Sequence, residues 1–205
     1  MSQRSPRVAV GPDHRPVGRD PGLHSLLAAY QESVVRLRAL DAVTTELVRL
    51  RCARQHDCRI CQALRLADSA TAGATDEVAS QIDHYEDSDL SDRHKVALRI
   101  VDAFIWQPSG ITPELAQSAH EHFTDDELAE VLLDITKWST QKIHVALGTD
   151  GADRLPTNDS GVAYFSFGDD GAVARITDAM HTAVRAMPTE SRSSPTEPSF
   201  ERRVR

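Results

Sequence analysis

The sequence predicts an all-α protein, and three observations lead to this fold class. Apolar residues recur at the three- to four-residue spacing of amphipathic helices through most of the chain. Residues that favour helix N-termini precede several of these segments. The single strand candidate is the run Val162–Phe167 (VAYFSF), which could instead be an extended arm. Because only 5% of the residues are aromatic, the core is expected to consist mostly of Leu, Val, Ile and Ala.

In the first half of the chain, capping residues separate the helical segments. Asp41, Asp57 and Thr75 can each accept a hydrogen bond from the first turn that follows them. The third segment opens with Cys58 and ends at Gly73, a favourable residue for a helix C-terminus. The expected spans are Leu23–Leu40, Asp41–His56, Asp57–Gly73 and Thr75–Tyr85.

In the second half, the cap signals are stronger. Thr112 with Pro113 forms an N-cap and N1 pair, and Thr124 with Glu127 forms a capping box. The expected spans are Ser91 to shortly before Pro108, Thr112–Phe123, Thr124–Gly148 and Ala172–Met187. One face of the long helix is expected to hold Leu128, Val131, Leu132, Ile135, Trp138 and Val145. Ser139 and Lys142 continue that stripe, either at its rim or in a pocket.

Composition divides the chain into one domain and two tails. Residues 1–21 are rich in Arg and Pro without apolar periodicity, so we expect a flexible arm. Residues 22–187 are expected to form a single helical domain, with a core at 41–148 and an extension at 149–187. Residues 188–205 are poor in apolar residues and are expected to be a disordered tail.

Charge and cysteine content narrow the function classes. A net charge of −8 argues against general binding to nucleic acid or to an anionic membrane. No apolar run is long enough to span a bilayer, and the N-terminus lacks the apolar stretch of a secretory signal. Three cysteines are too few for a disulfide scaffold, so a reducing, cytoplasmic location is expected.

The chemistry-bearing motif is the C-x-x-C formed by Cys58 and Cys61. Residues three apart on a helix share a face, so the two sulfurs can meet. Placed in the first turn of a helix, a thiol has a lowered pKa because the positive end of the helix dipole favours the thiolate. Arg65, four residues beyond Cys61, is expected to lie on the same face and to favour the thiolate by its charge. Arg59 adds more positive charge nearby. This is the geometry of a pair that cycles between dithiol and disulfide.

Other interpretations of the cysteines remain open. The pair could be half of a zinc site, with Cys52 or His56 as further ligands, but no second ligand pair of suitable spacing is present. The cysteines could also be plain core residues, which is the favoured interpretation of Cys52. No metal site and no cofactor are assigned from the sequence.

The segment ELVRLRCARQHDCRICQALR resembles the AhpD-like (alkylhydroperoxidase D-like) branch of the carboxymuconolactone decarboxylase family, whose motif is E-x₁₁-C-x-x-C-x₃-H. The resemblance implies an all-α, AhpD-like multi-helix bundle that assembles as a trimer or hexamer. It also implies peroxide reduction by the cysteine pair. By position, Cys61 would be the nucleophile that attacks the peroxide. Cys58 would be the resolving thiol, and the carboxylate of Glu46 would help to deprotonate it.

The chain departs from that motif at the histidine. Arg65 stands where the family has its histidine, and Ile60 stands where some members have one between the cysteines. Arg65 can stabilise a thiolate but cannot carry a proton. His56, two residues before Cys58, is the candidate substitute for the proton relay.

Three functions from different classes are therefore carried forward. The first is a thiol-dependent peroxidase or disulfide oxidoreductase, whose partners would be a small-molecule peroxide and a dithiol electron-donor protein. The second is a lactone decarboxylase or isomerase-type lyase, in which Glu46 and Arg65 would do acid–base and carboxylate-binding work. The third is a non-enzymatic, redox-sensing helical partner protein. A homo-oligomer is expected because Tyr164, Phe165 and Phe167 would be costly to leave in water.

Overall fold

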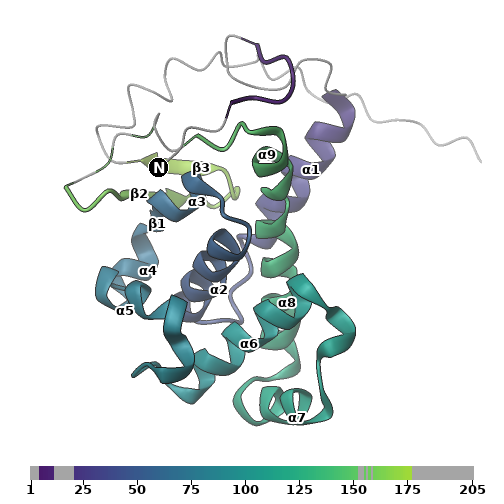
Figure 1. Ribbon diagram of the computed structural model, residues 1–205, viewed down its shortest axis with the longest axis vertical. Helices are drawn as coiled ribbons and strands as arrows, with labels where there is room; N and C mark the ends of the chain where they lie inside the picture. The colour runs from purple at the N-terminus through teal and green to yellow at the C-terminus, as the bar shows by residue number, and fades with distance from the viewer. Residues whose placement is uncertain (1–4, 12–20, 152–154, 156, 158, 177–205) are drawn as a thin grey trace, which may run out of the picture.

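The computed structural model describes residues 5–11, 21–151, 155, 157 and 159–176. In this part of the chain, helices pack around a central helix, and a small sheet lies at one end (Figure 1). The helices are α1 (Pro21–Val34), α2 (Ala42–Gln55), α3 (Arg59–Ala63), α4 (Ala67–Thr71), α5 (Asp76–Ser80), α6 (Asp92–Trp106), α7 (Pro113–His122), α8 (Asp125–Ser139) and α9 (Lys142–Leu147). Short 3₁₀ segments cover Gln81–Asp87 and Pro108–Gly110. The mostly helical fold predicted from the sequence is confirmed.

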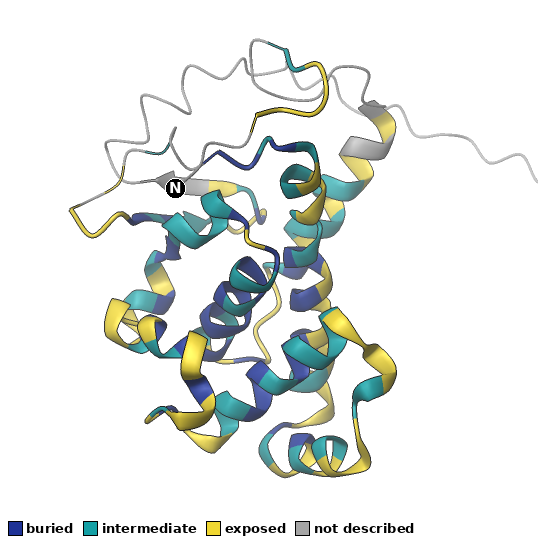
Figure 2. Ribbon diagram, in the orientation of Figure 1, coloured by how far each residue is buried: buried dark blue, intermediate teal, exposed yellow. Residues whose placement is uncertain are grey.

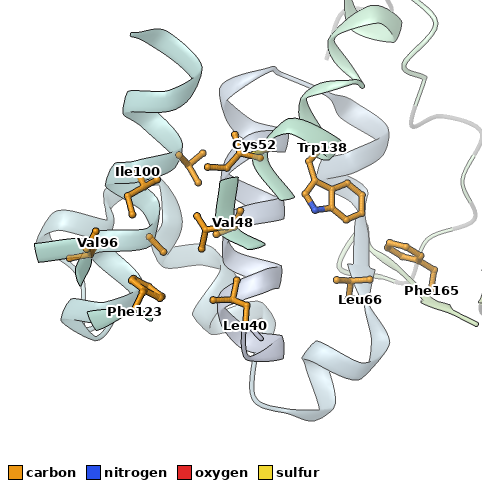
Figure 3. Packing of buried hydrophobic residues seen from close by; sticks show 14 residues of the cluster. Leu40, Val48, Cys52, Leu66, Val96, Ile100, Phe123, Trp138 and Phe165 are labelled. Carbon is orange, nitrogen blue, oxygen red and sulfur yellow. The ribbon is translucent and has the colours of Figure 1, made fainter. Parts of the chain in front are cut away.

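Helix α2 is the centre of the molecule. It packs against α6 and α8, and none of its residues is exposed (Figure 2). Val48 and Cys52 of α2 meet Ile100 of α6 and Trp138 of α8 in the main apolar cluster (Figure 3). A helix without exposed residues holds the side chains at its end in fixed positions, and the candidate site begins where α2 ends.

The caps predicted from the sequence are largely confirmed. The side chains of Asp41, Thr75, Ser91 and Thr112 each accept a hydrogen bond from the first turn of their helix. Thr124 and Glu127 form the reciprocal capping box at the start of α8. Asp57 is the exception: it lies in the left-handed region with φ of 51°, and Cys58 is the N-cap of α3 without a side-chain hydrogen bond.

The helix expected from Asp57 to Gly73 is wrong. The chain leaves the helical path after Ala63, forms strand β1 (Leu64–Leu66), and starts the short helix α4. Strand β1 pairs in parallel with β2 (Ala163–Phe167), which pairs antiparallel with β3 (Val173–Ile176). The strand candidate VAYFSF is thus confirmed, and its distant pairing explains why β1 is not helical: the partner strand lies far along the sequence.

Other element boundaries differ from the expected ones. Helix α1 ends at Val34 instead of Leu40, and the long helix expected to reach Gly148 breaks between Ser139 and Lys142. On α8 the exposed face includes Leu132, which was expected inside. The buried positions include three charged residues, namely Glu130, Asp134 and Lys137. Gly148 does end α9, in the left-handed conformation.

The expected terminal segments are described only in part. Residues 5–11 of the expected flexible arm lie against the end of α9, where Arg7 donates hydrogen bonds to the carbonyls of Ala146 and Leu147. The helix expected over Ala172–Met187 is wrong for Val173–Ile176, which is strand β3. The rest of that expected helix and the expected tail at 188–205 lie outside the described residues. None of the described helices combines the length and apolar character needed to cross a membrane.

Candidate redox site

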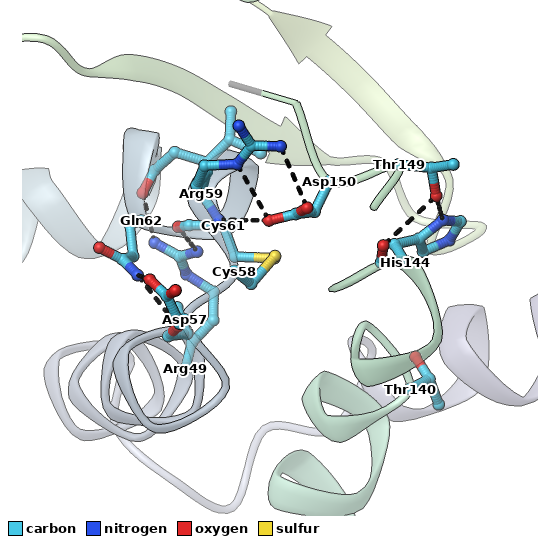
Figure 4. The surroundings of a disulfide bond; sticks show 12 residues. Arg49, Asp57, Cys58, Arg59, Cys61, Gln62, Thr140, His144, Thr149 and Asp150 are labelled. Carbon is cyan, nitrogen blue, oxygen red and sulfur yellow. Dashed lines mark hydrogen bonds and ion pairs between the residues drawn. A yellow bond between two sulfur atoms is a disulfide. The ribbon is translucent and has the colours of Figure 1, made fainter. Parts of the chain in front are cut away.

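Cys58 and Cys61 lie together at the start of α3 and are joined by a disulfide, with their Cα atoms 5.4 Å apart (Figure 4). The contact expected between the two sulfurs is confirmed. The two residues differ in accessibility, since Cys58 is fully buried and Cys61 is half-buried. Cys52, the remaining cysteine, is free and buried in the core, and burial raises the pKa of its thiol. Its position agrees with the core interpretation.

The turn before the cysteine pair is held by the end of α2. Backbone N–H groups of Asp57 and Cys58 donate to the carbonyls of Arg54 and Ala53. Since α3 is only five residues long, it has little of the dipole of the longer helix expected from the sequence. The expectation that a helix dipole lowers the pKa of a thiol here is therefore largely unsupported.

Arg65 does not lie beside Cys61 on one helix, as the sequence predicted, because α3 ends before it. Its guanidinium donates to the carbonyls of Gln62 and Leu64 and forms an ion pair with Asp76. Burial first, and the nearby Arg49 second, lower the pKa of Arg65. Its described contacts fasten the end of α3 to the start of α5, which is a structural arrangement.

Glu46 is buried and paired with Arg49, one turn further along α2. Arg49 donates to both Glu46 carboxylate oxygens at 2.6 and 2.7 Å, and the Leu66 N–H donates to one of them. Both side chains are about 1% exposed. The described hydrogen bonds of the Glu46 carboxylate thus go to a guanidinium and to strand β1, and none goes to a cysteine.

Arg49 links this ion pair to the cysteines, and sequence reasoning missed it. Its guanidinium donates to the backbone carbonyl of Cys61 at 3.0 Å and to that of Leu64. It also lies over the rings of Trp138 and Phe165, 5.7 and 5.8 Å from their centroids. The spacing of three residues from Glu46 within one helix was the signal that could have identified it.

His56 forms the C-cap of α2 and is buried. Its Nε2 lies 3.5 Å from the hydroxyl of Ser139, and its Nδ1 has no hydrogen-bond partner among the described residues. Burial, with the charge of Lys142 as a smaller cause, lowers the pKa of His56 to about 4. His56 is therefore neutral near pH 7. Lys142 is exposed, in agreement with a place at the rim.

Asp150, which the sequence analysis also missed, lies near the disulfide (Figure 4). Asp150 accepts hydrogen bonds from the backbone N–H and the side chain of Arg59. Burial raises the pKa of Asp150, but the hydrogen bonds from Arg59 outweigh it, and the net shift is downward. His144 contacts Thr149 nearby, with 3.2 Å between Nδ1 and Oγ1. The Asp/Gly-rich stretch after α9 carries no pattern that places Asp150 there.

A cavity of about 340 Å³ opens beside Cys61. Its walls are largely apolar, and its polar lining includes Arg49 and Lys137. Glu46 and Arg65 are not among its lining residues. Lining it are also Ile60, Leu64, Trp138, Phe165, Phe167 and the hairpin residues Gly171, Ala172 and Val173. Cys61, unlike Cys58, thus faces a space of the size that small-molecule sites have.

Metal binding has no support from a ligand cluster in the described residues. No group of three or more His, Cys, Asp or Glu side chains that could hold a metal ion occurs there. The zinc interpretation of Cys58 and Cys61 also requires two thiolates, whereas their sulfurs are joined here.

Fold and site together define a class: an AhpD-like helical fold that carries a C-x-x-C disulfide beside a cavity. A crystal structure of an Agrobacterium tumefaciens protein of unknown function, described as a candidate antioxidant defence protein AhpD, is similar to the chain with a TM-score of 0.54. The two share 19% sequence identity over 62% of this chain and 89% of that chain. The AhpD-like fold that the motif implied is thereby confirmed. No family model matches the chain.

The curated relatives are two uncharacterized proteins of Mycobacterium tuberculosis, from strain CDC 1551 / Oshkosh and strain ATCC 25618 / H37Rv. Each is 40% identical to the chain over 140 residues, which is 68% of this chain and 48% of the relative. The chain therefore spans about half the length of the curated relatives it matches.

Proposed function

We propose that the chain is a thiol-dependent peroxidase or disulfide oxidoreductase that cycles Cys58 and Cys61 between dithiol and disulfide. The observation that carries this proposal is the asymmetry of the pair, since Cys58 is fully buried and Cys61 lines the cavity. An attacking thiolate must reach its substrate, whereas a resolving thiol needs only to reach the neighbouring sulfur. The accessible member matches the role of nucleophile, and the buried member matches the role of resolving thiol.

The Cys61 thiolate attacks the terminal peroxide oxygen, so that an S–O bond forms as the O–O bond breaks. The products are a sulfenic acid on Cys61 and an alkoxide that takes up one proton and leaves as an alcohol. The Cys58 thiol then attacks the sulfenic sulfur, giving the disulfide and one water. A dithiol donor protein returns two electrons and two protons by thiol–disulfide exchange.

Within this proposal Glu46 and Arg65 are positioning residues. Glu46 holds Arg49, which in turn holds the Cys61 carbonyl, and Arg65 holds the carbonyl of Gln62. The lyase alternative needs Glu46 and Arg65 to face a substrate, and neither lines the cavity beside Cys61. His56, neutral and buried, is a weak base near pH 7.

The proposal also includes a substrate, a reductant, an oligomeric state and a compartment. The substrate is a small-molecule peroxide, the reductant is a dithiol protein, and the working form is a homo-oligomer of three or six chains. The compartment is the cytoplasm, because a cycling disulfide needs a reducing supply. No bound cofactor takes part in the cycle, since both redox centres are sulfur atoms of the chain.

The test is peroxide consumption by the purified protein with several dithiol donors. We expect turnover that is lost in Cys61→Ser and kept in Cys52→Ala, the matched control at the core cysteine. Peptide mapping after one peroxide equivalent should find Cys58 and Cys61 in one disulfide. A protein that forms this disulfide but never turns over would instead be a redox sensor. A protein that neither consumes peroxide nor oxidises would rule out the proposal.

A further inference from the structure

The Lys137 side chain is buried and has no described ion pair. It lies near the end of α8, and only 6% of its surface is exposed. Within the described part of the chain its ammonium forms no hydrogen bond and no ion pair. Instead it lies over the aromatic rings of Trp138 and Phe167. The Nζ atom itself is not sealed from solvent, and Lys137 lines a cavity, so its N–H groups are open to an acceptor in that cavity.

The side chains around Lys137 supply little negative charge to it. Burial lowers the pKa of Lys137 well below its usual value, and Arg49 of α2 adds to the effect. Asp134, one turn earlier on α8, opposes it. However, burial and the neighbouring Glu130 raise the pKa of Asp134 itself to about 7. Asp134 therefore supplies only part of a negative charge near neutral pH.

The space next to Lys137 is the cavity that Cys61 lines. Lys137 and Cys61 both line this one volume, and its lining also includes Trp138, Phe165 and Phe167. Aromatic walls favour an apolar body. Of the two basic lining residues, Arg49 is paired with Glu46, and Lys137 is the one that can offer its donors to an anionic group. Glu32 of α1 also lines the cavity, and its carboxylate opposes each negative charge that a ligand carries.

We propose that this cavity is a binding site for an organic acid with an apolar body, whose carboxylate accepts hydrogen bonds from the Lys137 ammonium. The apolar body lies against the aromatic side chains of the cavity lining. Resting on the proposed function, the inference names the substrate class as well: hydroperoxides of apolar carboxylic acids, bound so that the peroxide group faces Cys61. Lys137 is then a specificity-determining residue, and the acid group is recognised at a distance from the reacting sulfur.

The test measures binding to the oxidised protein, so it needs no turnover. Octanoate and methyl octanoate serve as probes that share an apolar body and differ in charge. Because a charge-assisted hydrogen bond discriminates strongly, we expect the acid to bind about 10-fold or more tightly than the ester. Lys137→Met should remove that preference while ester binding stays similar. Lys142→Met, at an exposed lysine outside the cavity lining, should keep it.

Two results would overturn the inference. One is equal affinity of the unmodified protein for acid and ester, a comparison that holds even if Lys137→Met fails to fold. The other is a folded Lys137→Met variant, checked by circular dichroism, that keeps the full preference for the acid.

Acid binding and peroxide turnover can be tested independently of each other. Acid binding without peroxide turnover would support the site and contradict the redox cycle. Turnover of an uncharged hydroperoxide such as cumene hydroperoxide, together with equal binding of acid and ester, would support the cycle and contradict the acid site. With both correct, a fatty-acid hydroperoxide should be reduced with a lower KM than its methyl ester, and Lys137→Met should abolish that difference.

Discussion

At the residue scale, the Glu46–Arg49 pair is the feature on which the site depends most. Both side chains are almost wholly buried, and Arg49 also holds the carbonyls that follow the cysteine pair. Two buried charges repay their desolvation only while they stay together. Removing one charge therefore costs more than the pair itself contributes.

The first prediction concerns that pair. Glu46→Gln should lower the free energy of unfolding by about 3–5 kcal/mol, because it leaves the Arg49 charge buried without a partner. The double variant Glu46→Leu/Arg49→Met should lose less than the sum of the two single variants. Urea denaturation of the unmodified protein, Glu46→Gln, Glu46→Leu, Arg49→Met and the double variant measures this. Glu86→Gln, at the exposed ion pair with Arg99, is the control and should cost under about 1 kcal/mol. Additive losses at Glu46 and Arg49 would contradict the coupling.

The second prediction concerns two buried groups with opposite pH effects. Burial raises the pKa of Asp134 to about 7, so its share of stability is present at low pH and is lost as pH rises from about 4 to 7. Burial lowers the pKa of His56 from 6.5 to about 4, so its share is present above pH 6.5 and is lost as pH falls to about 4. As pH rises from about 4, Asp134 thus makes the protein less stable and His56 makes it more stable, over much of the same pH range.

Variants separate the two pH effects. Relative to the unmodified protein, Asp134→Asn should gain stability as pH rises between about 4 and 7, on the order of 1–3 kcal/mol. His56→Gln should show the reverse trend, on the order of 1 kcal/mol. Thermal melting across this pH range measures both. Difference curves that stay flat with pH would show that neither group titrates with a shifted pKa.

At the element scale, the β2–β3 hairpin closes one side of the cavity and rests on α1. Gly171 in its turn has φ of +81°, and a Cβ atom there would collide with the Glu32 carbonyl. Only glycine satisfies both the backbone conformation and the close approach.

The third prediction follows from this contact. Gly171→Ala should destabilise the protein by about 1–3 kcal/mol and weaken ligand binding in the cavity, because the hairpin must move away from α1. Gly161→Ala is the matched control, since Gly161 has φ of +77° but open space around its Cβ position. It should show the conformational cost alone. Melting temperatures and octanoate affinity compare the two, and equal effects in both variants would remove the role assigned to the contact.

The sequence predicted those elements that local chemistry determines. The caps at Asp41, Ser91, Thr112 and Thr124 depend on residues within three positions of each other, and each is confirmed. Strand β1 depends instead on pairing of Leu64 with Ala163, and no local pattern encodes such a partner. The misplacement of Arg65 on a helix has the same origin.

The candidate site was predictable to a similar extent. The C-x-x-C spacing was sufficient to bring Cys58 and Cys61 together. Arg49 and Lys137 were missed. The sequence analysis gave roles to other residues of their helices, and nothing in the sequence showed that these two side chains are buried. Charged residues at buried helix positions have no periodic signature, so only packing shows which of them face a cavity.

At the scale of the whole molecule, the aromatic residues expected to pack against a neighbouring subunit are covered within the chain. Phe165 is buried, and Tyr164 and Phe167 are half-buried within the chain itself, so these aromatics do not require a neighbouring subunit. Large apolar side chains that do remain exposed include Leu26 and Trp106, at 71% and 70%. Burying such side chains against a second copy of the chain would stabilise an assembly.

The fourth prediction is that the chain self-associates through such surfaces. Light scattering after size-exclusion chromatography should give a mass near three or six times 22.6 kDa. Leu26→Lys should shift that mass downward without loss of helical signal. A mass of 22.6 kDa for the unmodified protein at micromolar concentration would contradict the prediction.

The parallel pairing of β1 with β2 also constrains the order of folding. It joins Leu64 to Ala163, which are 163 − 64 = 99 positions apart, whereas most helix contacts around α2 close shorter loops. Contacts of high sequence separation form late, because the entropy of closing a long loop must be offset first. The helical core can therefore assemble while the wall that carries Phe165 and Phe167 is still absent. During synthesis, Cys61 would leave the ribosome long before the residues of its cavity wall. In that period the thiol is exposed to solvent, and no cavity limits which molecules can reach it.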